Sequence, residues 1–363
     1  MTGSTPVSGR IRIPRPGRVL ELARTRLRRP RIDVRTAETI LDRYGLRLSG
    51  SVANLPFGWR HRSVVLPTPA GRKVLKRYRD GWSEGAIEHE HSILRHLEAE
   101  GYPAVRVEQD RVGRTVVADD LGHVALFGFE SGVNLTGFLL PRRRSDRLWR
   151  EAGTVLAGFH AAVAGFVPNG RHHLGFDGTS EGRRRDLAWH RDVIERLTHV
   201  PPPADPTAAA NVRSLVGDAH RIVERIAELE QRLAAVGLTR SVIHGDPGIH
   251  NLLVRRDGTA VLTDFELSRI EWRLIDIAIV LSRTDERAGR AFIDGYDAAL
   301  PDRLGEREHL LDVWEHYRLC GAVQSWATFA RLGDPRRLAT ARSRVEEADQ
   351  IAVRGHDAVA ALR

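Results

Sequence analysis

Residues 240–282 read RSVIHGDPGIHNLLVRRDGTAVLTDFELSRIEWRLIDIAIVLS. Two short apolar runs within this segment, 252–254 and 260–263, are separated by a turn at Asp257 and Gly258. An Asp-Gly pair between short apolar runs is a strong signal for a β-hairpin. We therefore predict a hairpin here, which returns the chain to the point where its first strand began.

Three polar residues flank this hairpin at its open end. Asp246 and Asn251 precede the first strand, and Asp264 directly follows the second strand. Because the strands of a hairpin run antiparallel, we expect these three side chains to lie together. Their oxygen atoms are hard ligands of the kind that Mg²⁺ accepts alongside substrate phosphates, and Asp246 is placed to take a proton from an attacking hydroxyl. The alternative is that the three residues only cap the hairpin.

Positive charge in this chain is almost entirely arginine. Among 56 Lys and Arg residues, Lys73 and Lys76 are the only lysines. Lysine offers a compact ammonium group, whereas the arginine fork is broad and planar. A retained lysine therefore indicates a position that arginine does not fit, with chance composition as the alternative. Both lysines lie on the second of two predicted strands, 63–66 and 73–76, which Pro and Gly residues separate.

A helix is predicted over residues 83–100, with Ser83 as its N-cap. Glu90 lies on the apolar stripe of this helix, between Ile87 and Leu94. A carboxylate on an apolar face is costly unless a cation or hydrogen-bond donors meet it. Lys76, on the strand just before the helix, is the candidate partner. The alternative is that Glu90 stands at the edge of the stripe and reaches water.

Two short motifs occur in this region of the chain. They are H-G-D-x-x-x-x-N at residues 244–251 and D-F-E at residues 264–266. Together they resemble the aminoglycoside phosphotransferase/choline kinase branch of the protein-kinase-like superfamily, and the resemblance covers roughly residues 37–335. It implies an α+β, bilobal protein-kinase-like fold, with a small antiparallel β-rich N-lobe and a larger α-helical C-lobe.

The resemblance assigns a role to each matching residue. Lys76 would contact the α- and β-phosphates of ATP, and Glu90 would hold Lys76 in place. Asp246 would act as the base or orient the acceptor hydroxyl, while Asn251 and Asp264 would bind Mg²⁺. ATP and Mg²⁺ are therefore the implied cofactors.

Two further residues are implied to support the catalytic loop. His244 stands beside Asp246 in the catalytic motif, but it is expected to brace the loop by hydrogen bonds more than to perform chemistry. Asp276, on a new helix, resembles the family's structural aspartate. Residues 50–63, before the first predicted hairpin, contain no G-x-G-x-x-G, so the sequence leaves their contact with phosphates open.

The predicted elements divide the chain into three parts. These are a basic N-terminal arm at 1–36, a kinase-like N-lobe at 37–122, and a helical C-lobe at 123–363 with the catalytic loop and the substrate site. The boundary between the lobes is placed at the break in the sheet at residues 119–122. Helices of the C-lobe are expected at 146–163, 213–236, 314–332 and 339–361.

The arm holds most of the net charge of +9, because residues 1–36 contain ten arginines against Glu21 and Asp33. Apolar residues at near-helical spacing between 19 and 27 allow a short amphipathic helix. We interpret the arm as solvated or as a cap on the next domain. Contact with nucleic acid or an anionic membrane is the alternative that its charge leaves open.

Composition excludes several classes of protein. The single cysteine, Cys320, rules out a disulfide within the chain and argues against a cysteine-based zinc site. No apolar run approaches the roughly 18 residues of a membrane span, and no signal-peptide core follows the N-terminal arginines. We expect a cytoplasmic protein without a transmembrane segment.

The sequence therefore predicts an ATP-dependent kinase that phosphorylates a hydroxyl of a small molecule such as an aminoglycoside, a sugar or an amino alcohol. A protein kinase is disfavoured, because G-x-G-x-x-G, H-R-D and A-P-E are missing and residues 264–276 are too few for an activation loop. The alternative is a catalytically weak kinase-fold scaffold whose arm contacts nucleic acid or membrane. The acceptor, a role in antibiotic resistance, the choice between ATP and GTP, and the oligomeric state are left open.

Overall fold

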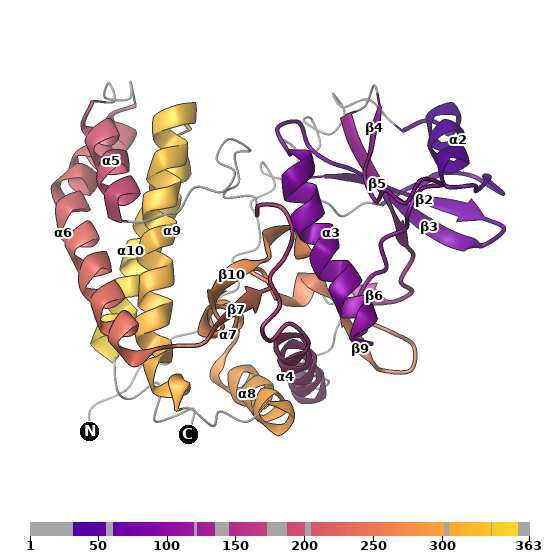
Figure 1. Cartoon of the computed structure of the whole chain (residues 1–363). Helices are drawn as coiled ribbons and strands as arrows, with labels where there is room; N and C mark the ends of the chain where they lie inside the picture. Colours follow the sequence, from indigo (N-terminus) through magenta and orange to yellow (C-terminus); the bar gives the residue numbers. More distant parts are fainter. Residues whose placement is uncertain are drawn as a thin grey trace.

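The computed structural model describes residues 32–55, 61–119, 122–134, 145–172, 187–199, 205–300, 305–334 and 336–354. Figure 1 shows a lobe that contains a sheet, with helices α2 and α3 against it, beside a larger lobe that is mostly helical. The bilobal α+β fold expected from the sequence is thus confirmed.

The sheet of the N-lobe is built around the hairpin that carries both lysines. Strand β2 (Arg62–Thr68) pairs antiparallel with β3 (Gly71–Arg77). Leu66 and Leu75 of these strands are fully buried against α2 (Val34–Arg43). Three strands complete the sheet in the order β1-β2-β3-β5-β4, namely β1 (Ala53–Asn54), β5 (Gly122–Gly128) and β4 (Val117–Asp119).

The sheet extends past the predicted lobe boundary at residue 122. Strand β5 pairs with both β3 and β4, so the sheet ends at Gly128. The sheet continues across the predicted break, because Asp119 at the end of β4 pairs directly with Gly122 at the start of β5, and residues 120 and 121 lie outside the described residues. In a sequence, a polar segment that contains glycine marks a connection within a sheet and a lobe boundary equally well.

The predicted arm also ends earlier than residue 36. Ile32 is buried in the core of the N-lobe, and the carboxylate of Asp33 caps α2 by accepting a hydrogen bond from the Thr36 N–H at 2.8 Å. Residues 32–36 therefore belong to the N-lobe. Residues 1–31, including the predicted amphipathic helix, lie outside the described residues.

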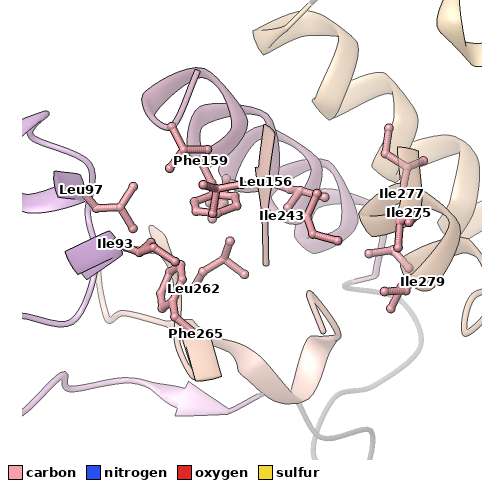
Figure 2. Packing of buried hydrophobic residues seen from close by; sticks show 14 of the residues in the cluster. Ile93, Leu97, Leu156, Phe159, Ile243, Leu262, Phe265, Ile275, Ile277 and Ile279 are labelled. Atoms are coloured by element: carbon pink, nitrogen blue, oxygen red, sulfur yellow. The ribbon is translucent and has the colours of Figure 1, made fainter. Parts of the chain in front are cut away.

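Helix α3 (Glu84–Ala99) connects the cores of the two lobes. Ser83 caps it, as predicted, because its hydroxyl accepts a hydrogen bond from the first turn. Leu97 is fully buried in a core that continues through Phe159 and Phe265 in the C-lobe. Figure 2 shows these side chains converging, and the two phenylalanine rings lie 5.6 Å apart between centroids. The helix that bears Glu90 is thus fixed against the segment that bears the D-F-E motif.

The C-lobe is built from helices around two small antiparallel sheets. Its helices are α4 (Ser145–Ala162), α5 (Leu187–Thr198), α6 (Pro206–Val236), α7 (Leu274–Leu281), α8 (Glu286–Ala299), α9 (Leu310–Leu332) and α10 (Arg336–Arg354). The sheets are β6 (Val133–Asn134), β8 (Leu252–Val254) and β9 (Ala260–Leu262), and separately β7 (Arg240–Ile243) with β10 (Arg269–Trp272). Helix α4 packs along α8, while α5, α6, α9 and α10 share a second core around Trp326. In Figure 1 that group of helices stands farthest from the sheet of the N-lobe.

The predicted helices of the C-lobe are present, with shifted ends. Helix α6 begins at Pro206 because Asp205 caps it and proline fits the first helical position. The last part of the final predicted helix, beyond residue 354, lies outside the described residues. Among the described residues, none of the helices combines the length and the apolar run that a membrane span requires.

Candidate active site

The hairpin of the C-lobe forms as predicted and brings the polar residues at its open end together. Strands β8 and β9 pair antiparallel, with Leu252 opposite Leu262. Beyond this pair, the Thr263 N–H donates to the carbonyl of Asn251 at 2.9 Å. The side-chain amide of Asn251 donates to the Asp246 carbonyl at 2.9 Å. The loop before β8 is therefore tied to the segment after β9 that carries Asp264.

Asp276 supports the loop that carries Asp246. Its carboxylate lies in the first turn of α7, is fully buried, and accepts hydrogen bonds from the N–H groups of His244 at 2.7 Å and Gly245 at 2.8 Å. The buried imidazole of His160 lies 3.1 Å from the same carboxylate. These are the contacts of a structural aspartate, the role that the sequence resemblance implied.

We predict that Asp276→Ala lowers the free energy of unfolding by about 2 to 5 kcal/mol. The substitution leaves two buried N–H groups without an acceptor, and each unsatisfied group costs about 1–3 kcal/mol. Urea denaturation followed by circular dichroism measures this loss. Asp276→Asn is the matched control, because it keeps the volume and one acceptor oxygen and is expected to lose less stability. An alanine variant as stable as the wild type would show that Asp276 does not hold the loop.

His244 fixes the loop that carries Asp246 from inside the protein. It is fully buried, with Nε2 3.0 Å from the Thr263 carbonyl and Nδ1 accepting from the Asp246 N–H at 3.3 Å. Burial lowers the pKa of His244, which favours the neutral ring. Next to it, Gly245 has φ of 80°, and a side chain there would collide with the carbonyl of Leu267. The buried ring of His244 thus ties the loop to Thr263, and the residue beside it has to be a glycine.

Two side chains that the sequence did not point to, a histidine and an arginine, contact the carboxylate of Asp246. His250 Nε2 lies 2.9 Å from Oδ2, and Arg283 Nη1 donates to Oδ1 at 2.7 Å. Burial by itself would raise the pKa of Asp246, but the hydrogen bond from His250 and the charge of Arg283 hold that pKa well below its usual range. Asp246 is therefore ionised at neutral pH.

Lys76 and Glu90 meet as the sequence predicted. Lys76 Nζ lies 2.9 Å from Glu90 Oε1, and both side chains are buried. Burial would lower the pKa of Lys76, but the surrounding carboxylates, Glu90 above all, raise it above its ordinary value. The hydroxyl of Tyr78 also donates to Glu90, at 3.0 Å. Glu90 is thus buried with charged and polar partners, and does not reach water at the edge of the helix.

Two carboxylates of the D-F-E motif approach the same lysine. Asp264 Oδ1 lies 3.9 Å and Glu266 Oε2 lies 3.6 Å from Lys76 Nζ. Glu266 also lies 2.5 Å from Nε2 of the buried His61 at the start of β2. In the sequence, Glu266 stands out only as part of the D-F-E motif, and no pattern points to His61. The lysine of the N-lobe and the acidic residues of the C-lobe therefore share one site.

Asp264 and Asn251 each leave side-chain oxygens available to a ligand. Asp264 has φ of 69°, in the left-handed region, and its side chain is 48% exposed. Strained backbone of this kind concentrates at functional sites. The side-chain oxygen of Asn251 accepts no hydrogen bond from the described residues, because its NH₂ group makes the side-chain contacts. These two hard oxygen donors fit Mg²⁺.

A complete metal site is not formed by the described side chains alone. Among them, no group of three or more His, Cys, Asp and Glu residues is arranged to hold a metal ion. Mg²⁺ commonly binds through one or two protein oxygens and completes its coordination with substrate phosphates and water. The donor set therefore fits a metal that arrives with a nucleotide.

The chain matches one family of enzymes over most of its length. Residues 51–309 match the model of the phosphotransferase enzyme family, and this span contains every site residue described above. No curated protein matches the chain in sequence.

Solved structures with similar folds include three that are 15–18% identical to this chain. An amicoumacin kinase in complex with AMP-PNP, Ca²⁺ and Ami has a TM-score of 0.57, at 15% identity, over 86% of this chain and 92% of its own. An aminoglycoside phosphotransferase from Alicyclobacillus acidocaldarius subsp. acidocaldarius DSM 446 has a TM-score of 0.58, at 18% identity, over 92% and 97%. A choline/ethanolamine kinase family protein from Mesorhizobium loti has a TM-score of 0.58, at 17% identity, over 87% and 93%.

Proposed function

This chain belongs to the phosphotransferase enzyme family, and we propose that it transfers the γ-phosphoryl group of ATP, with Mg²⁺, to a hydroxyl of a small molecule. The family match confirms the resemblance drawn from the two sequence motifs, and with it the assignment as a small-molecule phosphotransferase. One observation carries the proposal further: Lys76 of the N-lobe, paired with Glu90, lies 3.9 Å from Asp264 of the C-lobe. Phosphate-contacting and metal-binding groups thus face one another.

The proposed reaction is a direct transfer between two oxygens. The oxygen of the acceptor hydroxyl forms a bond to the γ-phosphorus. At the same time the bond between the γ-phosphorus and the β–γ bridging oxygen breaks, and the electron pair of that broken bond stays on the bridging oxygen of ADP. The hydroxyl proton passes to Asp246 and then to water. Because Asp246 is held ionised by His250 and Arg283, it accepts a hydrogen bond from the hydroxyl throughout and takes the proton late, as suits a loose transition state.

The remaining residues position the phosphates. Lys76 contacts the α- and β-phosphates, and Glu90 fixes the direction of its ammonium group. Asn251 and Asp264 would hold Mg²⁺, which supplies neutralisation of the phosphate charge. The neighbouring amicoumacin kinase structure, which contains AMP-PNP and Ca²⁺, supports a nucleotide and a divalent cation at a site of this fold.

A panel of hydroxyl compounds tests the proposal by ADP release in the presence of Mg·ATP. At least one amino alcohol, sugar, hydroxy acid or aminoglycoside is expected to raise ADP release well above the rate without acceptor. Asp264→Asn is the control, because it keeps the side-chain volume but removes the charge of the metal ligand. ADP release that no acceptor stimulates, in a protein that binds Mg·ATP, would contradict the proposed transfer.

We predict that Mg²⁺ binding depends on the nucleotide. Since the described side chains offer the metal only two oxygen donors, calorimetry with Mg²⁺ alone is expected to give little heat, whereas Mg·ATP gives a saturable isotherm. Asp264→Ala should weaken binding of Mg·ATP much more than binding of metal-free ATP in EDTA. Equal weakening of both would mean that Asp264 does not act through the metal.

A further inference from the structure

We propose that Arg283 binds an anionic group of the phosphate acceptor, so that the acceptor is a hydroxyl compound that also carries a carboxylate or a phosphate. This inference rests on the proposed function and names the substrate class of the same site. It comes from the surroundings of Asp246, the residue against which the acceptor hydroxyl must lie.

The carboxylate of Asp246, against which the acceptor hydroxyl would lie, is contacted by the guanidinium of Arg283 and the imidazole of His250. Arg283 Nη1 and His250 Nε2 each approach a different oxygen of Asp246, at 2.7 Å and 2.9 Å. Arg283 lies two residues after the C-terminal end of α7, and His250 lies in the short turn before β8. An acceptor that reaches Asp246 must therefore lie against a guanidinium group.

Arg283 has donors to spare for a ligand. Asp246 is the one side chain among the described residues with which its guanidinium makes an ion pair or hydrogen bond. A guanidinium carries five N–H donors in a planar fork that matches a carboxylate or a phosphate. The side chain is 47% exposed, so the remaining donors are accessible to a bound molecule.

The loop leaves room for both the guanidinium of Arg283 and the ring of His250 beside Asp246. A Cβ atom at Gly248 would lie 2.6 Å from Arg283 Nη1 and would also collide with the ring of His250. Any larger residue at this position would push one or both groups away from Asp246. Glycine at 248 is thus what allows the guanidinium to stand beside the carboxylate.

The arrangement distinguishes between acceptors of different charge. An anionic substituent can engage the free N–H groups of Arg283 and draw the guanidinium toward itself, which uncovers Oδ1 of Asp246 for the hydroxyl. A cationic substituent in the same place is repelled by Arg283, and the carboxylate that could attract it already has two partners. The site therefore favours an acidic acceptor over an amino alcohol of the same size.

Matched acceptors test this selectivity in turnover. The series ethanolamine, ethylene glycol, glycolate and 2-hydroxyethyl phosphate varies the charged group beside one hydroxyl, and comparison of the last two separates carboxylate from phosphate. In the wild type, kcat/KM for at least one of the anions is expected to exceed that of ethylene glycol by about tenfold, the effect of one charge-assisted hydrogen bond. Arg283→Gln should lower the ratio of kcat/KM for the anion to kcat/KM for ethylene glycol about tenfold, and this ratio, rather than either value alone, is the readout.

Arg290→Gln is the matched control. Arg290 is 51% exposed and makes a 2.7 Å ion pair with Glu286 on α8, so it resembles Arg283 in exposure and pairing but does not touch Asp246. Its substitution is expected to leave the preference among the four acceptors unchanged. A wild type that prefers ethanolamine, or an Arg283→Gln variant that keeps the preference for anions, would overturn the inference.

A binding measurement separates this inference from the proposed function. With AMP-PNP and Mg²⁺ filling the nucleotide site, calorimetry should detect glycolate or 2-hydroxyethyl phosphate, and Arg283→Gln should weaken that binding about tenfold. If neither anion binds the AMP-PNP complex, or both bind the two proteins equally, Arg283 is not an anion site and the phosphotransferase proposal stands. Failure of AMP-PNP itself to bind would instead contradict the proposed function.

Discussion

Replacing Asp246 with alanine is expected to lower kcat by about 10² to 10⁴-fold, the usual contribution of a positioned acid–base group. The acceptor hydroxyl then has no carboxylate to orient it or to receive its proton. Lys76, Asn251 and Asp264 are untouched, so the Kd for Mg·ATP should stay within about threefold. Steady-state kinetics and calorimetry on the same preparation give both values.

Asp257→Ala is the matched control for this substitution. Asp257 lies in the turn of the same hairpin, where its carboxylate accepts hydrogen bonds from Thr259. Because that turn is at the far end of the hairpin from Asp246, kcat should change little. Thermal melting of each variant checks that it is folded. An Asp246→Ala enzyme with near wild-type kcat would remove Asp246 from the mechanism.

Lys76→Arg is expected to lower kcat/KM by about 10²-fold although the charge is kept. The ammonium group is buried and lies within 3.9 Å of three carboxylates, those of Glu90, Glu266 and Asp264. A guanidinium is wider and delivers its charge through a planar fork, so it cannot occupy the same point without displacing one of these partners. Loss of a charge-assisted contact of this kind costs about 1.5–3 kcal/mol.

The other lysine provides the control. Lys73 lies on the same strand and pairs with Glu108 at 2.5 Å, away from the D-F-E motif. Lys73→Arg therefore makes the same chemical change outside the proposed site, and kcat/KM should remain close to the wild-type value. Similar losses in the two variants would point to a general effect of the substitution on the sheet.

A double-mutant cycle with Glu90→Gln tests whether the two residues act as a pair. Residues in direct contact typically show non-additivity of about 0.5 to 3 kcal/mol in such cycles. We expect the transition-state energies of Lys76→Arg and Glu90→Gln to be coupled in that range. Additive effects, or an active Lys76→Arg enzyme, would show that Glu90 does not position Lys76 for catalysis.

Local patterns in the sequence were sufficient for much of the fold and for the paired residues of the site. The hairpin of the C-lobe followed from an Asp-Gly turn between two apolar runs, and it brought Asn251 and the segment of Asp264 together. The pair of Lys76 and Glu90 followed from a rare lysine beside a carboxylate on an apolar stripe. In each case a local pattern determined which side chains had to meet.

Contacts between distant segments left no such pattern. Arg283 is one of many arginines in the chain, and its contact with Asp246 depends on how the end of α7 packs against the catalytic loop. The contact of His61 with Glu266 depends on how the N-lobe packs against the D-F-E segment. The extent of the sheet was also misjudged, because a polar segment that joins two strands of one sheet has the same composition as a linker between lobes.

Transfer of a labelled phosphoryl group tests the central claim most directly. ATP radiolabelled at the γ-phosphate is incubated with the wild type, Mg²⁺ and an acceptor selected by the ADP-release panel, and with Asp264→Asn in parallel. We predict that the label appears on the hydroxyl of the acceptor, with one labelled phosphoryl group transferred for each ADP formed. The Asp264→Asn variant should give almost no labelled acceptor. Label recovered only as inorganic phosphate, at a rate that the acceptor does not change, would contradict the account.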